Sequence, residues 1–421
     1  MEFKVINIIN HAPAYDIHRD RPRPAINWDT PNGKWVGIWG FEWHDILGNN
    51  VLRMTNDLTY EVWQPDDRAD KIYEHIFPNG LVHKLFPAIY KSYVFGFKLH
   101  RDITSDILVE ELEKEVNRKQ PLVLHVNAGY RYINVPILNK LYNRVPIVSQ
   151  FYTNSLETFE VPKTINPFRL AHAYKKNHLL RNYYRKVKYI IPSVSEGVEY
   201  FEKKFGAKIY YRDVQNFGSD YKEWSRKFTI TEARKKLGIP DDKFIFFSSS
   251  RLIPVKQIDR MIVALSKLKN KNFICYISGR GKEEYEIYLK KLVSNSKMDE
   301  YIKFIGYVDV EILQTYFQAA DLLLSTSKLD AGPSSPFHAS AMGTPSLITD
   351  TGIASEFFKK HSVGIIVPVD NYERWVMELE EVLKGKNIKV PPREKVVEFG
   401  DWDKISKYYY EIYKNLLNYA I

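Results

Sequence analysis

Short apolar runs alternate along the whole chain with longer segments whose apolar residues recur at helical spacing. Each run is apolar on nearly every residue, which predicts a strand buried on both faces. Strands of this kind, separated by helices, build open parallel sheets that helices cover on both sides, so we expect an α/β fold. The runs lie at residues 3–9, 60–63, 122–126, 146–151, 189–194, 244–250, 272–279, 302–308, 321–327, 345–350 and 364–369.

The length of the chain predicts more than one domain. Its 421 residues exceed the roughly 250 to 300 at which a single hydrophobic core stops growing. Asn, Gly, Ser and Asp cluster between the two series of strands, at residues 210–224. We therefore expect two doubly wound domains, 1–214 and 215–400, followed by an amphipathic helix at 401–421.

Cysteine usage and the first residues of the chain point to a reducing compartment. Cys275 is the one cysteine, so the fold does not depend on an internal disulfide and no cysteine cluster predicts zinc. The start lacks the basic flank and long apolar region of a signal peptide. No stretch reaches the ~18 apolar residues of a transmembrane helix. We expect a cytoplasmic protein.

The net charge of +10 and the pI near 9.1 predict an acidic partner. Nucleic acid, an anionic membrane surface and a phosphate-bearing small molecule all fit this charge. Much of the excess lies in residues 174–189, where Lys, Arg and Tyr interleave. That segment fits a solvated helix face leading into a strand, a surface that docks on an anionic membrane or lipid phosphate, or a nucleic-acid site.

Ligands of open α/β sheets bind beyond the carboxyl ends of the strands, so the residues that follow each strand carry the functional predictions. Arg251 and Lys256 follow one strand and precede a helix, where two cations converge on one anion such as a diphosphate. Two ordinary surface cations are the alternative. Gly279 and Gly281 allow a close approach of the backbone to a ligand.

The stretch DAGPSSPFHASAMGTP, residues 330–345, combines a carboxylate, a helix start and a run of small residues. The amides of Ser334 and Ser335 begin a helix whose unpaired N–H groups and positive dipole end suit a phosphate. Pro336 fits the first turn, where a missing N–H costs nothing. A purely structural Gly-Pro-Ser turn is the alternative.

Five motifs in order, between about 234 and 385, resemble the nucleotide-binding domain of the GT-B glycosyltransferases of family 4. They are an Arg-Leu-x-Pro-x-Lys turn at 251–256, the SGRG turn at 278–281, the Gly-Tyr-Val turn containing Tyr307, ADLLLSTS at 320–327 and AMGTPSLITDTGIASEF at 341–357. The resemblance implies two Rossmann-like domains facing across a cleft and a C-terminal helix that returns to the first domain. It also implies retaining sugar transfer from a nucleoside-diphosphate sugar, with no metal and no further cofactor.

The family has two glutamates with seven residues between them at the 330–345 stretch, and this chain keeps the spacing with other side chains. Asp330 stands at the first position, which the resemblance places beside the donor sugar. His338 stands at the second position, which in the family holds the ribose. A histidine can still hydrogen-bond a hydroxyl at this position, but it lacks the fixed negative charge of the glutamate.

The first half resembles the family more faintly. Gly37 and Gly40 match a glycine-rich turn ahead of a helix that carries His44, and they come after an unusual insert at 11–32. Tyr152 stands where many relatives have a histidine that contacts the donor sugar. Asn127 stands where a second histidine is common, whereas His125 alone fits a hydrogen-bonded core residue better than a catalytic one.

These observations predict a glycosyltransferase. Asp330, Arg251 and Lys256 are the expected catalytic residues. A catalytically impaired module that binds sugar nucleotide or glycan is the alternative, as is an epimerase or phosphorylase of the same fold. We expect a nucleotide sugar, a glycan or lipid-linked acceptor and peripheral contact with anionic membrane as partners, and no nucleic acid. The expected donor-binding residues are Gly40, Tyr152, Gly279, Gly281, Tyr307, Ser334, Ser335 and His338.

Overall fold

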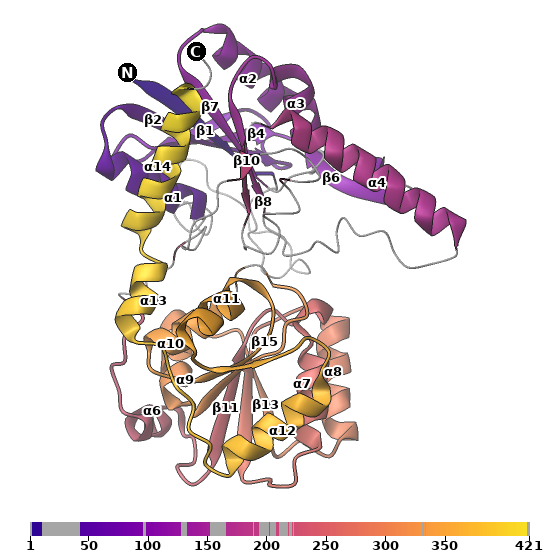
Figure 1. The fold of residues 1–421 in the computed structure, drawn as a ribbon, viewed down its shortest axis with the longest axis vertical. Coiled ribbons are helices and arrows are strands. Elements are labelled where there is room, and N and C mark those ends of the chain that lie inside the picture. The colour runs from indigo at the N-terminus through magenta and orange to yellow at the C-terminus, as the bar shows by residue number, and fades with distance from the viewer. Residues whose placement is uncertain are drawn as a thin grey trace. The chain divides into compact units, whose positions relative to one another are not determined.

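The computed structural model shows a chain of alternating strands and helices (Figure 1). It describes residues 2–10, 43–95, 98–127, 133–151, 166–187, 189–192, 202, 208–209, 218, 221, 223–330, 332 and 334–418. These residues divide into two compact units. The first unit holds the strands and helices up to residue 218 together with the C-terminal helix, and the second holds the described residues of Ser219–Asp401.

The first unit is built on a sheet of strand order β10-β9-β8-β7-β1-β2-β4-β3. Neighbouring strands are parallel except for β3, which runs antiparallel to β4. The expected strands of the first half are all present, and β3, β4 and β10 extend the sheet beyond them. The bounds are β1 Phe3–Ile8, β2 Leu58–Asp66, β3 Tyr73–Ile76, β4 Val82–Pro87, β7 Leu122–Asn127, β8 Ile147–Phe151, β9 Tyr189–Pro192 and β10 Lys208–Ile209.

A separate antiparallel pair of strands follows β4, with β5 at Ile89–Phe95 and β6 at Lys98–Thr104. The sequence analysis did not predict this pair. The helices of the unit are α1 Trp43–Met54, α2 Asp106–Asn117, α3 Asn134–Leu141, α4 Pro167–Lys186 and α14 Trp402–Asn418.

Alternating residues of β1 enter two different cores, as a strand buried on both faces requires. Ile6 and Ile8 pack with α2 and α3. Phe3 and Val5 lie on the opposite face and pack with α1 and α14. The C-terminal helix therefore completes the core of the first unit, where tyrosines and aliphatic residues of α14 are buried: Ile405, Tyr408, Tyr409, Ile412, Tyr413 and Leu416.

The second unit has an all-parallel sheet of strand order β13-β12-β11-β14-β15-β16. Figure 1 shows helices on both sides of this sheet. The strands are β11 Phe244–Ser249, β12 Phe273–Ser278, β13 Ile302–Gly306, β14 Leu322–Ser325, β15 Ser346–Thr349 and β16 Ile365–Val367. The helices are α6 Ile230–Leu237, α7 Ile258–Ser266, α8 Glu283–Asn295, α9 Val310–Ala319, α10 Ser335–Ala341, α11 Gly352–His361, α12 Tyr372–Leu383 and α13 Arg393–Phe399.

Among the described helices, none is both long enough and apolar enough to cross a membrane.

Candidate functional site

The strand order of the second unit places its ligand site. The chain builds outward from β11 through β12 to β13, and then crosses back to build outward on the other side through β14 to β16. Ligands of such sheets bind at the switch between the two directions, beyond the carboxyl ends of the central strands. The loops that follow β11 and β14 carry Arg251, Lys256 and Asp330, so three predicted residues lie at this switch.

Lys256 and Asp330 form an ion pair between Nζ and Oδ2. Their side chains are 14% and 13% exposed, so water screens the pair only in part. The Ser327 hydroxyl also donates to Oδ2, at 3.3 Å. On the lysine side, the Thr326 hydroxyl donates to the Lys256 carbonyl at 2.9 Å. The two loops are thus joined through both side chains and backbone.

The loop that carries Asp330 is also fixed to β15. The Thr349 hydroxyl donates to the Ser327 carbonyl at 2.5 Å. The Asp330 amide donates to the Thr351 hydroxyl at 3.4 Å, and Thr351 is the residue before α11. The loops that follow β11, β14 and β15 therefore fix the position of the Asp330 carboxylate together.

Arg251 is exposed. Its guanidinium forms no ion pair in the part of the chain that the structure describes. Its loop is held by backbone hydrogen bonds to the next strand, from Ser250 N to the Ser278 carbonyl at 3.1 Å and from Leu252 N to the Arg280 carbonyl at 2.8 Å. The position of this loop is fixed while its cation stays available to a ligand.

Gly279 and Gly281 have a packing role that the sequence analysis did not predict. A Cβ on Gly279 would lie 1.8 Å from the Ser250 carbonyl oxygen, and one on Gly281 would lie 1.8 Å from that of Leu252. Gly279 also has a φ of +133°. Both glycines thus let the Arg251 loop pass against β12, and their approach to a ligand stays a prediction.

Tyr307 follows β13 and is 49% exposed. The Arg280 guanidinium lies over its ring, 5.9 Å from the centroid. Cation–π contact of this kind holds a side chain loosely at an exposed position. Tyr307 lies at the carboxyl edge of the sheet, where β12 and β11 lie between its strand and β14.

The helix start in the 330–345 stretch is present. Ser334 is the N-cap of α10, and Pro336 lies in its first turn. The Ser335 hydroxyl donates to the Ser249 carbonyl at 2.5 Å, which ties the start of α10 to the end of β11. The small residues Ala339, Ser340 and Ala341 are buried, as a helix in close contact with its neighbours requires.

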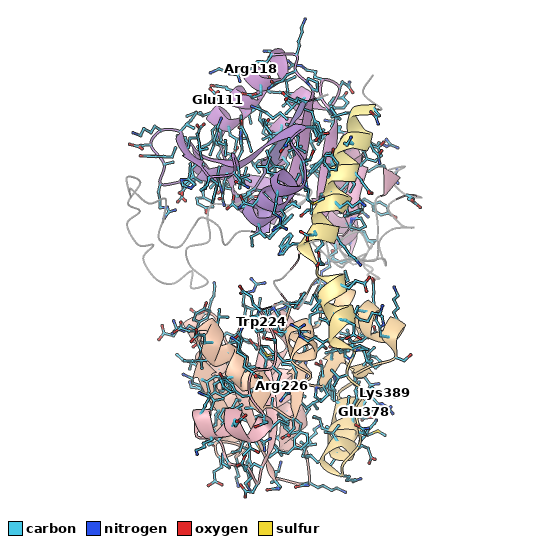
Figure 2. The ribbon with its side chains drawn as sticks, turned by 90° about the vertical axis from the view of Figure 1, so that its left-hand side faces the viewer. Glu111, Arg118, Trp224, Arg226, Glu378 and Lys389 are labelled. Atoms are coloured by element: carbon cyan, nitrogen blue, oxygen red, sulfur yellow. The ribbon has the colours of Figure 1, made fainter. Side chains whose placement is uncertain are left out.

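His338 lies one turn further along α10, and its ring stacks on Trp224 with the centroids 3.6 Å apart and the planes at 5°. Burial lowers the pKa of His338 to about 3, so the ring is neutral. Arg226, two residues after Trp224, donates from Nε to the carbonyl of Met342 at 2.7 Å, at the other end of α10. Figure 2 labels Trp224 and Arg226, which hold α10 at two points.

The sheet of the first unit has its own switch, between β1 and β7, and buried asparagines line it. Asn10 donates from Nδ2 to the Asn127 carbonyl at 3.0 Å, and Asn134 donates to the same carbonyl at 2.8 Å. Sequence reasoning named Asn127 but missed Asn10 and Asn134. Asn10 comes just after a strand and Asn134 begins a helix, and these positions in the sequence could have indicated both residues.

His125 is a core residue, as expected. It is fully buried, and burial lowers its pKa to about 3. Its Nδ1 lies 2.9 Å from the Tyr413 hydroxyl of α14, and its ring stacks on Tyr409. The Tyr409 hydroxyl donates to Gln150 Oε1 at 2.7 Å. The C-terminal helix therefore contacts polar groups on β7 and β8.

Several predicted residues lie outside the described residues. They are Gly37, Gly40, Tyr152 and the insert at 11–32. His44 is described, and it lies buried on α1. Within the described ranges, no group of three or more His, Cys, Asp or Glu side chains could hold a metal ion.

Comparison with known protein families identifies the second unit. A sequence model of the family described as "Glycosyl transferases group 1" matches residues 229–400. The second unit is a glycosyl transferases group 1 domain. Every predicted site residue of this group 1 domain, from Arg251 to His338, lies inside the matched segment.

Curated relatives match the chain over part of its length. An uncharacterized glycosyltransferase, MJ1607 of Methanocaldococcus jannaschii, is 25% identical over 213 residues, which cover 49% of this chain and 53% of the relative. The lipopolysaccharide core biosynthesis mannosyltransferase LpsB of Rhizobium meliloti is 26% identical over 182 residues, covering 41% and 51%. The chain thus spans about half the length of these two relatives.

The structural comparison covers both units. Anabaena Alr3699/HepE, solved in complex with UDP, superposes with a TM-score of 0.63 at 13% identity, over 99% of this chain and 100% of that protein. The chain therefore has the GT-B fold, with a group 1 domain as the second of two Rossmann-like domains.

Proposed function

We propose that the chain is a retaining glycosyltransferase that moves a sugar from a nucleoside diphosphate to an acceptor hydroxyl. One observation carries the proposal: Lys256 and Asp330 meet at the switch point of a group 1 domain, beside the exposed Arg251. A nucleotide sugar needs cations for its diphosphate and a polar group for its sugar. This cluster offers both within one set of loops.

In the proposed reaction, the bond between the anomeric carbon and the diphosphate oxygen breaks. The acceptor oxygen forms its bond to the same carbon from the same face, and the acceptor proton passes to the leaving diphosphate. Negative charge on the diphosphate grows as the bond breaks. Fixed cations stabilise such charge more in the transition state than in the ground state.

Each residue of the cluster has a distinct part in this reaction. Arg251 and Lys256 neutralise the leaving diphosphate, with the amides at Ser334 and Ser335 as further donors. Asp330 holds Lys256 in place and orients the donor sugar, whose anomeric carbon becomes positive. His338, neutral and stacked on Trp224, hydrogen-bonds a ribose hydroxyl. The retaining course and the absence of a metal follow the resemblance to family 4.

Two similar proteins support the proposed classes of donor and acceptor. A UDP complex in a protein of the same fold supports a nucleoside-diphosphate donor. The name of the LpsB relative supports an acceptor in glycan, glycolipid or surface polysaccharide synthesis.

A thermal-shift panel of nucleoside diphosphates and nucleotide sugars tests the proposal. A ligand at 100 times its Kd adds about 2.7 kcal/mol to the free energy of unfolding, so one base should raise the melting temperature clearly. Arg251→Gln should reduce that shift. Lys267→Gln is the matched control, because Lys267 is exposed at the other end of α7. A silent panel contradicts the proposal, and binding without transfer to any acceptor hydroxyl supports an impaired module.

A further inference from the structure

Two residues of the second unit that are not glycine have a left-handed backbone and contact each other. Gln257 follows Lys256 directly and has a φ of +51°, and Asp370 follows β16 and has a φ of +63°. The Gln257 Nε2 atom donates a hydrogen bond to Asp370 Oδ1 at 3.0 Å, across 113 positions of the sequence. A left-handed backbone costs free energy in any residue that has a Cβ. Such strain persists only where the surrounding structure holds the residue in place, and it gathers at functional sites.

Gln257 is the junction between the turn that ends in Lys256 and helix α7. The turn is a short 3-10 helix, and the Gln257 amide closes it by donating to the Pro254 carbonyl at 3.0 Å. The Gln257 carbonyl accepts from the Arg260 amide at 3.0 Å, in the first turn of α7. A glycine would adopt this backbone without strain. The glutamine keeps the strain and is only 8% exposed, so its side chain contributes contacts that a glycine would lack.

The Gln257 side chain contacts the segment between β16 and the first residue of α12. Besides its bond to Asp370, Nε2 donates to the Tyr372 hydroxyl at 3.3 Å. That hydroxyl in turn donates to Asp370 Oδ1 at 2.7 Å. The hydrogen bonds from Gln257 and Tyr372 hold the pKa of Asp370 below its usual range. The carboxylate is therefore charged at neutral pH, and a charged acceptor makes the stronger hydrogen bond.

Asp370 also joins the loop that carries Asp330. Its second oxygen, Oδ2, forms an ion pair with Lys328 Nζ at 3.4 Å. The Lys328 amide donates to the Val255 carbonyl at 2.8 Å, so the loops after β11 and β14 are joined there through the backbone. The Lys328 and Asp370 side chains are 48% and 51% exposed, and an ion pair at such a surface contributes little. The buried amide of Gln257 is therefore the stronger of the two links from Asp370 to the site.

We propose that Gln257 and Asp370 are positioning residues for Lys256. Their hydrogen bond ties the end of the Lys256 turn to the loop after β16, and so fixes the lysine where the leaving diphosphate forms. Neither residue contacts the substrate. The inference rests on the proposed function, because that function assigns Lys256 to the diphosphate. A cation that is held in place before the sugar leaves stabilises the new charge without first having to reorganise.

Titration calorimetry of the full chain with inorganic pyrophosphate tests the inference. Pyrophosphate has the two phosphates of the leaving group without a base or a sugar, so the test needs no identified donor. Gln257→Gly removes the hydrogen bond and suits the left-handed backbone, so this variant should fold normally. We expect it to bind pyrophosphate about fivefold more weakly, which corresponds to the loss of one hydrogen bond of about 1 kcal/mol.

Reversing the hydrogen bond separates positioning from a merely structural role. Gln257→Glu combined with Asp370→Asn exchanges the amide and the carboxylate and keeps the net charge. The amide then stands on the loop after β16 and donates in the opposite direction, so we expect most of the lost pyrophosphate affinity to return. Gln257→Glu alone brings two carboxylates together and should weaken binding more than Gln257→Gly does. Binding by the double variant as weak as that of Gln257→Gly overturns the proposal.

Ser362→Gly is the matched control, because Ser362 is exposed after α11 and has a left-handed φ of +53°. We expect it to bind pyrophosphate as the unchanged chain does, and a loss equal to that of Gln257→Gly overturns the proposal.

Lys256→Ala measures the contribution of the lysine itself and should weaken pyrophosphate binding more than Gln257→Gly does. If Lys256→Ala binds as tightly as the unchanged chain, or the unchanged chain does not bind pyrophosphate, the proposed function is contradicted and the positioning role fails with it. A loss in Lys256→Ala together with normal binding by Gln257→Gly overturns the positioning role alone.

Discussion

Lys256 and Asp330 are 74 residues apart in the sequence and form an ion pair at the switch point of the second sheet. They meet because β11 and β14 are neighbours in the sheet although β12 and β13 lie between them in the chain. The pair itself is nearly neutral, so Arg251 supplies the excess positive charge of this edge. A diphosphate placed there would contact Arg251 and compete with Asp330 for Lys256.

We predict that Gly281→Ala destabilises the second unit. The new Cβ would lie 1.8 Å from the Leu252 carbonyl oxygen, so the Arg251 loop must shift. We expect a loss of about 3 kcal/mol in the free energy of unfolding, measured by urea denaturation. Gly306→Ala is the comparison, because it meets no atom within 4 Å but has a φ of +70°. It should cost about 1 kcal/mol, and an equal loss in both variants would contradict the packing role of Gly281.

We predict that His125 makes the protein less stable at acidic pH. Burial lowers its folded pKa from 6.5 to about 3, so the unfolded chain binds the proton more readily. The free energy of unfolding should therefore fall as the pH drops from about 6.5 to 3, by up to about 1.4 kcal/mol per pH unit from this group. Urea midpoints at several pH values measure this slope. His125→Gln, which keeps a hydrogen-bonding partner for Tyr413, should show a flatter profile, and an unchanged profile would refute the assignment.

We predict that the two contributions of His338 separate in two variants. His338→Phe keeps a ring to stack on Trp224 but cannot make the hydrogen bond to the ribose that we propose. It should keep the melting temperature and weaken donor binding about fivefold, because one hydrogen bond contributes about 1 kcal/mol. His338→Ala should lose both stability and donor affinity. Calorimetric melting and donor titration measure the two quantities. Normal donor affinity in His338→Phe would show that His338 does not contact the donor.

Most strands of the two large sheets could be predicted from the sequence because they contain a short apolar run, whereas β4, with His83 and Lys84 in it, and the two-residue β10 were not predicted. Val5 and Ile6 illustrate this, since they enter opposite cores and both must be apolar. β3 was not predicted, because its alternate residues are exposed and its sequence, YEHI, has no continuous apolar run. The antiparallel pair of β5 and β6 was not predicted either, because charged residues interrupt both strands.

The sequence indicated which residues gather at the candidate site, but it did not indicate most of the contacts between them. Residue types after each strand, and their order, indicated Arg251, Lys256 and Asp330. The ion pair between two of them depends on the strand order, which no local pattern encodes. The stack of His338 on Trp224 likewise joins residues 114 positions apart, and the packing role of Gly281 depends on the path of a neighbouring loop.

The central claim is that Lys256 acts on charge that develops as the sugar leaves. Once the thermal-shift panel has identified a donor and transfer to an acceptor is detected, the steady-state kcat of Lys256→Ala tests it most directly. Asp330→Asn serves as the partner variant and Lys267→Gln as the control. We predict that kcat falls by roughly 10² or more in both site variants, with a smaller change in donor affinity. Near-normal turnover in both Lys256→Ala and Asp330→Asn would show that the active site lies elsewhere.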